Sequence, residues 1–212
     1  MNDTALPTES RAARRKRVTR QALLDAGQQI MAEKGVDAAT MMEIAAQADV
    51  GTGTAYNYFA SKDELAVSVL EQVMDRLARR IEAATSGFAD PAQVYAFGVR
   101  TVIAEATTDR RWRWLLRRSE VIADAMYRVM GPYAVRDIRI AAEAGRFRTA
   151  DPALTFRLAT HVLVGFSLAV CDGTLPAAQI EDTIVALLGM AGMPHQEARA
   201  VASRPRPALP PE

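Results

Sequence analysis

The sequence predicts an all-α protein in which an N-terminal helix-turn-helix domain precedes a larger helical bundle, with about nine helices in total. Two observations lead to this prediction. Helix-start signals and a tight turn crowd into residues 40–65, and beyond residue 65 apolar residues recur at spacings of three and four, with no convincing strand pattern. With 212 residues, half of them hydrophobic, the chain can bury a sizeable core as one large domain or two small ones.

A short helix is expected to begin near Met41. Thr40 and Glu43 form a capping-box pattern, in which the hydroxyl and the carboxylate satisfy backbone donors that a helix start leaves without partners. The apolar stripe of this helix breaks at Asp49, a residue type that tolerates the left-handed conformation of a tight turn. The chain is therefore expected to turn at Asp49.

A second short helix is expected over residues 52–59, and its two faces differ in character. Ala55 and Phe59 stand one turn apart and can both face a core. The opposite face carries hydroxyls, an amide and aromatic edges but no formal charge, and these groups bond phosphates and base edges. Its residues are Gly53, Thr54, Tyr56 and Asn57, with Thr52 and Tyr58 on the flanks.

A third helix is expected directly afterwards, because Ser61 and Glu64 repeat the capping-box pattern and Lys62 falls in the first turn. Two short helices joined by a tight turn, the second polar on its outside, describe a helix-turn-helix whose second helix can enter a major groove. The alternative is a helical hairpin packed inside some other all-α protein. The Gly-Thr-x-Tyr-x-Tyr-Phe run from Gly53 has no obvious packing purpose, which favours the first interpretation.

Residues 20–65 resemble the N-terminal DNA-binding domain of the tetracycline-repressor (TetR) family of bacterial transcription regulators. The matching positions agree in register without a gap. They are Arg20, Leu24, Ala26, Gly35, Thr40, Ile44, Ala45, Ala48, Val50, Gly53, Thr54, Tyr56, Tyr58, Phe59, Lys62 and Leu65. The resemblance implies a regulator with an N-terminal DNA-binding domain and a C-terminal helical bundle that binds a ligand and dimerises.

Three positions depart from the family pattern. Asp49 stands where the family usually has Gly, Gly51 where it has a small polar Ser, and Ala55 where it has a larger aliphatic residue. The change at Gly51 removes an expected helix cap and phosphate contact. Met41 and Met42 also occupy positions where the family often supplies polar or basic contacts. Base reading is therefore expected to depend on the second helix of the motif.

Basic residues concentrate just before the motif. Residues 10–20 hold six Lys or Arg residues and no acid, although the formal net charge of the chain is only +1. Such an arm can neutralise phosphates or reach a minor groove, and the alternative is a solvated basic tail. The predicted DNA-binding residues are Arg14, Arg15, Arg17, Arg20, Thr40, Thr52, Gly53, Thr54, Tyr56, Asn57, Tyr58 and Lys62.

The domain boundaries follow from these signals. We expect a flexible basic arm at 1–17, the DNA-binding domain at 18–64, the ligand-binding and dimerisation domain at 65–192, and a disordered Pro-rich tail at 193–212. The helix that begins at Ser61 should continue to about Ala84 and link the two halves. Further helices are expected at 91–107, 109–118, 120–145, 151–172 and 176–192, the third of them kinked or broken at Gly131 and Pro132.

The last two expected helices carry apolar stripes that suit a four-helix dimer interface, as the resemblance also implies. The stripes consist of Leu154, Leu158, Val162 and Ala169 on one helix, and Ile180, Ile184, Leu187 and Ala191 on the other. The alternative is that both helices complete the monomer core. Because a two-fold dimer reads two half-sites, the predicted partner is a palindromic double-stranded DNA operator.

Aromatic and Met side chains in the bundle could line an apolar cavity for a small-molecule effector, an apolar or planar compound. The candidate ligand-binding residues are Tyr95, Trp112, Trp114, Met126, Tyr127, Met130, His161 and Phe166. Each could instead be core packing, since Met and aromatic residues fill cores by default. For His161 the bland alternative is a satisfied core histidine.

The segment DRRWRWLLRR at 109–118 allows a second nucleic-acid interpretation, because arginines surround two tryptophans that could stack on bases. Helical spacing favours a simpler interpretation of this segment as an amphipathic helix. Trp112 and the following leucines share a face that can pack inward, while the arginines share a face that is solvated.

Enzymatic functions find little support. The chain has two histidines, His161 and His195, in positions that form no helical pair of zinc ligands, and it has no P-loop, dinucleotide fingerprint or nucleophile elbow. We therefore expect no catalytic residues, no metal and no cofactor. The single cysteine, Cys171, suits a reducing cytoplasm, and no secretory signal is visible. The longest apolar stretch, Leu158–Cys171, falls short of a membrane span and is expected to be core.

Together these patterns predict a cytoplasmic, homodimeric, sequence-specific DNA-binding regulator, a repressor that its ligand releases. The alternative is a helical small-molecule-binding protein whose DNA binding is non-specific or vestigial.

Overall fold

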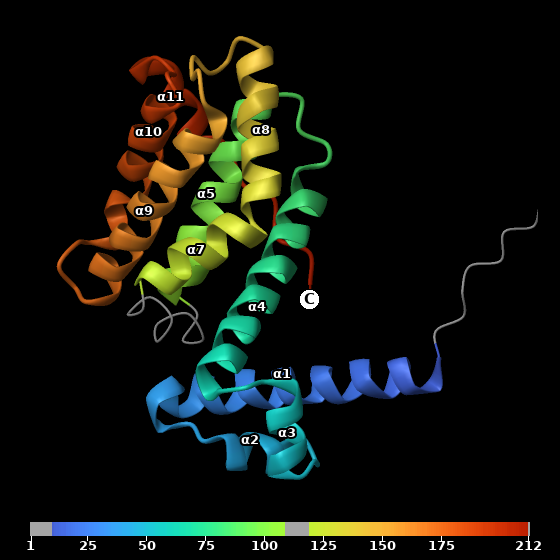
Figure 1. Cartoon of the computed structure of the whole chain (residues 1–212). Coiled ribbons are helices and arrows are strands. Elements are labelled where there is room, and N and C mark those ends of the chain that lie inside the picture. The colour runs from blue at the N-terminus through green and yellow to red at the C-terminus, as the bar shows by residue number, and fades with distance from the viewer. Residues whose placement is uncertain (1–9, 109–118, 212) are drawn as a thin grey trace, which may run out of the picture. The chain divides into compact units, whose positions relative to one another are not determined.

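The computed structural model describes residues 10–108 and 119–211. All regular elements in these ranges are helical, as predicted, and they form two compact units that divide between Val69 and Leu70 (Figure 1). The expected helix at 109–118, with Trp112 and Trp114, lies outside the described residues.

The N-terminal unit contains three helices and the beginning of a fourth. These are α1 (Arg11–Ala38), α2 (Met41–Gln47), α3 (Thr52–Tyr58) and α4 (Lys62–Thr85), and α4 continues without a break into the second unit. Leu23, Ile44 and Phe59 are fully buried, so the apolar sides of α1, α2 and α3 share one core.

The prediction of a flexible basic arm over residues 1–17 is wrong for the part that the structure describes. Helix α1 begins at Arg11, and the Ser10 hydroxyl caps it by accepting from the Ala13 backbone N–H at 3.2 Å. A serine directly before a helix is a standard N-cap. The six basic residues of positions 10–20 therefore all stand on helix α1.

The C-terminal unit is a bundle of helices around one core. Its elements after α4 are α5 (Pro91–Thr108), α7 (Ser119–Val129), α8 (Gly131–Glu143), α9 (Pro152–Cys171), the short 3₁₀ helix η1 (Ala177–Gln179), α10 (Ile180–Met190) and α11 (His195–Ala202). The break predicted at Gly131 and Pro132 is present, because α7 ends at Val129 and α8 starts with Pro132 in its first turn.

The prediction of a disordered tail over residues 193–212 is also wrong. Pro194 starts α11, whose Ala198, Val201 and Ala202 are buried in the bundle core. The chain after α11 is bonded to the rest of the bundle: Arg80 Nε of α4 donates to the Pro210 carbonyl at 2.7 Å, and Arg204 Nη1 donates to Oδ2 of Asp90, just before α5, at 2.7 Å. The Pro-rich composition concealed a short amphipathic helix.

Helices α9 and α10 use their apolar stripes differently. On α10, Ile184 and Leu187 are buried in the monomer core, whereas on α9 Leu154 and Leu158 are 53% and 50% exposed. At 20 residues α9 is long and apolar enough to cross a membrane by length and composition, contrary to the expectation that it would fall short. Its opposite side packs inside the bundle, with Phe156 and Leu163 buried, as in the core helix of a globular domain.

Candidate nucleic-acid interface and internal cavity

Helix α3 presents the polar face that its periodicity predicts. Ala55 and Phe59 are 0% and 1% exposed, while Thr52, Gly53, Thr54 and Asn57 are exposed and Tyr56 is 51% exposed. Tyr58 is half-buried, as expected for a flanking position. The buried pair anchors the helix from behind, so the hydroxyls and the amide point away from the core.

A capping box fixes where α2 begins, and a left-handed turn residue precedes α3. The Thr40 hydroxyl accepts from the Glu43 N–H at 3.3 Å, and the Glu43 carboxylate accepts from the Thr40 N–H at 3.0 Å, which completes the predicted capping box. Asp49 has φ 54°, the predicted left-handed turn residue. Gly51 supplies no side-chain cap to α3, as its departure from the family pattern implies.

The Lys34 side chain and, after it, the capping box lower the pKa of Glu43. Hydrogen bonds from Lys34 and from Thr40 lower the pKa of this carboxyl from 4.5 to about 2. Glu43 therefore stays ionised at any physiological pH and holds the first turn of α2 beside the last helical turns of α1.

Three of the predicted DNA-binding residues have bonds within the protein. The Thr40 hydroxyl belongs to the capping box, and Lys62 Nζ donates to the Asp37 carbonyl at 2.9 Å. The Arg20 guanidinium lies 5.1 Å from the centre of the Phe59 ring. These contacts position α2, α3 and α4 against α1, a role that does not depend on DNA.

A hollow of about 700 Å³ separates the first turns of α1 from α3. Arg15, Lys16 and Thr19 line one side of it, and Thr54, Asn57 and Tyr58 line the other. Lys16 and Thr19 were absent from the predicted binding residues. Thr19 lies one helical turn beyond both Arg15 and Lys16, at i+4 and i+3, a spacing that becomes meaningful only once this segment is known to be helical. Arg14 and Arg17 are exposed on the same helix.

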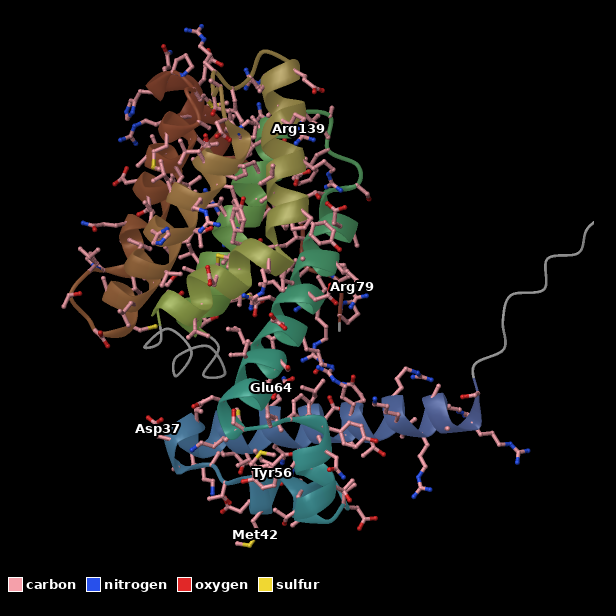
Figure 2. All side chains as sticks on the ribbon, viewed as in Figure 1. Asp37, Met42, Tyr56, Glu64, Arg79 and Arg139 are labelled. Carbon is pink, nitrogen blue, oxygen red and sulfur yellow. The ribbon has the colours of Figure 1, made fainter. Side chains whose placement is uncertain are left out.

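Met42 is an exposed apolar side chain on α2. It is 67% exposed and extends from α2 into solvent (Figure 2), whereas the adjacent Met41 is buried. An exposed thioether offers no formal charge to a phosphate. The departure noted in the sequence thus concerns one accessible apolar side chain on α2.

A cavity of about 50 Å³ lies inside the C-terminal unit between α4, α5, α7, α8 and α9. Three predicted ligand-binding residues line it: Tyr95, Met126 and Met130. Other lining residues were not predicted, notably Ala78 and Ile81 from α4 and Asp137 from α8. Small and charged residues carry no local signal for a cavity, since only the packing of the helices brings them together.

The remaining described candidates lie elsewhere. Tyr127 and His161 line a separate surface notch between α7 and α9, and Phe166 is buried in the bundle core. His161 is exposed, so the core-histidine alternative is wrong, and its Nδ1 lies 2.8 Å from the Arg157 carbonyl. Because α9 is apolar on more than one side, the sequence did not show which of its residues face inward.

The cavity lining contains two tyrosine hydroxyls, from Tyr95 and Tyr133, and two carboxyl groups, from Glu82 and Asp137. Tyr95 is buried and its Oη has no hydrogen-bond partner, while burial raises the pKa of the hydroxyl above its ordinary value. Arg136 donates from Nη1 to Glu82 Oε2 at 3.0 Å and from Nε to Asp137 Oδ1 at 3.0 Å. Burial raises the pKa of the Asp137 carboxyl, and the Arg136 hydrogen bond only partly offsets this.

Two family models match the chain. Residues 23–69 match the bacterial regulatory proteins of the tetR family, and residues 90–204, more than half of the chain, match the tetracyclin repressor-like C-terminal domain. The chain belongs to the TetR family. This is a family of bacterial regulatory proteins.

The chain is also similar to individual transcriptional repressors. The chain is 31% identical over 125 residues to the transcriptional repressor KstR of Mycolicibacterium smegmatis, and 32% identical over 123 residues to KstR of Mycobacterium tuberculosis. The matches cover 59% and 58% of this chain but only 59% and 54% of the relatives. Among solved structures, RolR in complex with resorcinol matches with a TM-score of 0.84 and 30% identity, covering 94% of this chain and all of RolR. RolR without ligand matches with a TM-score of 0.79.

Proposed function

We propose that this TetR-family chain is a homodimeric repressor that binds a palindromic operator and leaves it when a small molecule occupies the cavity of the C-terminal unit. The observation that carries the proposal is the pairing, in one chain, of an exposed polar face on α3 with a mainly apolar cavity that α4 helps to line. The KstR repressors and the resorcinol complex of RolR support the same interpretation.

On DNA, α3 would enter the major groove and α1 would follow the adjacent backbone. Thr54 and Tyr56 position the helix on phosphates, and Thr52 and Asn57 read bases, because a hydroxyl and an amide at these exposed positions can bond base edges. Arg14, Arg15 and Arg17 neutralise phosphates from α1, together with Lys16, which shares the hollow beside Asn57.

The dimer would form through α9 and α10. Leu154 and Leu158 on α9 and Met190 on α10 are exposed apolar side chains of the C-terminal unit, and a two-fold interface would bury them. The buried stripe of α10 serves the monomer, so its contribution to the dimer comes from the opposite face.

Coupling between the two sites would run through α4. Ala78, Ile81 and Glu82 of this helix line the cavity, and the same helix begins at Lys62, directly after the recognition helix and Phe59. Ion pairs from Arg128 to Glu71 and from Arg136 to Glu82 fasten α4 to α7 and α8. A ligand that shifts α7 or α8 thereby shifts α4, which biases the spacing of the two recognition helices.

The test measures DNA binding by fluorescence anisotropy, using the full chain and the DNA upstream of its own gene. We expect saturable binding to an inverted repeat that survives physiological salt and far exceeds binding to one half-site. Resorcinol is the first effector to add, since a structural neighbour binds it. Binding that occurs only at low salt and is indifferent to sequence would overturn the proposal.

The dimer has its own test in sedimentation velocity. Leu158→Glu should produce monomers, because it places a charge in the proposed interface, while Ile140→Glu on α8 is a matched control at an exposed apolar position outside it. A dimer that persists in Leu158→Glu contradicts the assigned interface. Ligand-induced loss of the dimer would refute release by a change in spacing.

A further inference from the structure

Of the two tyrosines that line the cavity, Tyr95 carries the buried hydroxyl, which is an oriented hydrogen-bond donor. Tyr95 projects from α5 and is 3% exposed, and its Oη makes no hydrogen bond within the described protein. Burial keeps the hydroxyl protonated because it raises the pKa. The ring is fixed by an edge-to-face contact with Phe147, whose centre lies 5.7 Å away. A molecule in the cavity with an oxygen near Tyr95 can accept this hydrogen bond.

The charged groups of the same cavity are arranged against anions. Glu82 and Asp137 line it, and the described lining residues include no Lys, Arg or His. The nearby Arg136 guanidinium bonds both carboxylates, bidentate to Glu82 and through Nε and Nη2 to Asp137. Two carboxylates thus share one guanidinium cation. An anionic ligand would lose its hydration without gaining a cation and would face the surplus carboxylate.

A neutral hydroxyl compound meets the opposite conditions. It can accept from Tyr95 Oη and donate to a carboxylate oxygen of Asp137 or Glu82, so that both polar parts of the cavity are satisfied. The remaining walls are apolar, from residues such as Val99, Met126 and Phe156, which suits a small ring. The limited volume of about 50 Å³ disfavours long or branched ligands in this conformation.

We infer that the effector is a small uncharged ring compound bearing hydroxyl groups, a phenol in chemical class, bound by Tyr95 as donor and by Asp137 or Glu82 as acceptor, and that its carboxylate analogues are rejected. The inference rests on the proposed function, since it concerns the effector of the same cavity. It adds that the cavity selects neutral over anionic ligands, and it assigns this selectivity to Tyr95, Asp137 and Glu82.

Two probes of nearly equal size isolate the charge: 3-hydroxybenzamide, which is neutral, and 3-hydroxybenzoate, which is an anion at neutral pH. Binding to the full-length chain is measured by isothermal titration calorimetry without DNA, with resorcinol as a smaller neutral probe. We expect the neutral probes to bind at least about tenfold tighter than the benzoate. Equal affinities, a preference for the benzoate, or no binding of either neutral probe at millimolar concentration would overturn the inference.

The variants test the two polar contacts separately. Tyr95→Phe should weaken resorcinol binding about tenfold without lowering the melting temperature, because the hydroxyl has no partner within the protein. Tyr127→Phe is the matched control, since this tyrosine lines the surface notch instead, and it should leave affinity unchanged. Asp137→Asn should narrow the gap between the amide and the benzoate.

The outcomes distinguish this inference from the function on which it rests. If resorcinol binds with the expected charge preference but the operator complex persists, release by ligand is wrong and the selectivity rule stands. If the operator is released by resorcinol and by the benzoate at equal concentrations, release stands and the selectivity rule is wrong. Unchanged affinity in Tyr95→Phe removes the assigned donor.

Discussion

The N-terminal and C-terminal units handle their polar groups in opposite ways. Helix α3 turns hydroxyls and an amide toward solvent and buries only Ala55 and Phe59 behind them, whereas the C-terminal cavity holds the buried, unpartnered hydroxyl of Tyr95 among mostly apolar walls. A large polymer must be reached from outside, and a small molecule is recognised by surrounding it. A short segment of sequence is therefore enough to predict the exposed face of α3, whereas the cavity forms only when five helices pack together.

The largest expected effect comes from removing the anchor of the exposed face. Phe59→Ala deletes a fully buried ring and should destabilise the N-terminal unit by about 3–5 kcal/mol, with loss of operator binding. Urea unfolding of the full chain followed by circular dichroism measures this. If the variant keeps wild-type stability, the polar face is not held from behind in the manner described.

A smaller effect is expected on the polar face itself. Asn57→Ala should cost about 1–3 kcal/mol in discrimination between operator and random DNA, because the amide is assigned to a base edge. Anisotropy titrations on both DNAs supply the numbers, and Gln179→Ala on the C-terminal unit serves as the control. Equal losses on the two DNAs would assign Asn57 to the phosphates instead.

The ion pairs of Asp90 with Arg146 and Arg204 lead to a prediction about the pH dependence of stability. Burial raises the pKa of Asp90, but hydrogen bonds from Arg146 and Arg204 outweigh it, so the pKa lies below its ordinary 3.8. A depressed folded-state pKa stabilises the fold above pH 3.8, and this contribution is lost as the pH falls through the lower folded value.

Asp90→Asn should therefore cost about 1–2 kcal/mol at neutral pH, and the cost should shrink in acid. Chemical unfolding at neutral and acidic pH measures both effects, with Asp172→Asn as an exposed control. A cost that stays constant with pH would mean that the carboxylate charge contributes nothing.

The smallest effect is expected at Met42. Because this side chain is 67% exposed, Met42→Ala should change stability by no more than about 0.5 kcal/mol. We also expect operator affinity to change less than in Asn57→Ala, since base reading is assigned to α3. A larger loss for Met42→Ala would move part of the specificity to α2.

Local patterns predicted the N-terminal unit well. The capping box at Thr40, the left-handed Asp49 and the buried side of α3 all agree with the structure. Each depends on residues within a few positions of one another, so the sequence contains the whole signal. The beginning of α1 was missed, because a run of basic residues has the same composition in a helix and in a tail.

The C-terminal unit was predicted in outline and missed in detail. Helix α11 was taken for part of a disordered tail because prolines dominate its flanks, although Ala198, Val201 and Ala202 form a buried stripe. Of the candidate ligand-binding residues, Tyr95, Met126 and Met130 line the cavity and their contact with a ligand stays a prediction, whereas Phe166 packs in the core and His161 lies on the surface. The chain order does not say which side of an apolar helix faces a cavity.

By itself, the sequence determined that the chain is helical, that α3 exposes an uncharged polar face, and that residues 20–65 resemble a TetR DNA-binding domain. The tertiary structure alone decided that Lys16 and Thr19 lie across a hollow from Asn57, and that Glu82, Tyr95 and Asp137 share one cavity. The physical reason is range. Helix periodicity and capping act over a turn or two of chain, whereas a cavity arises from the packing of α4, α5, α7, α8 and α9, which no local pattern specifies.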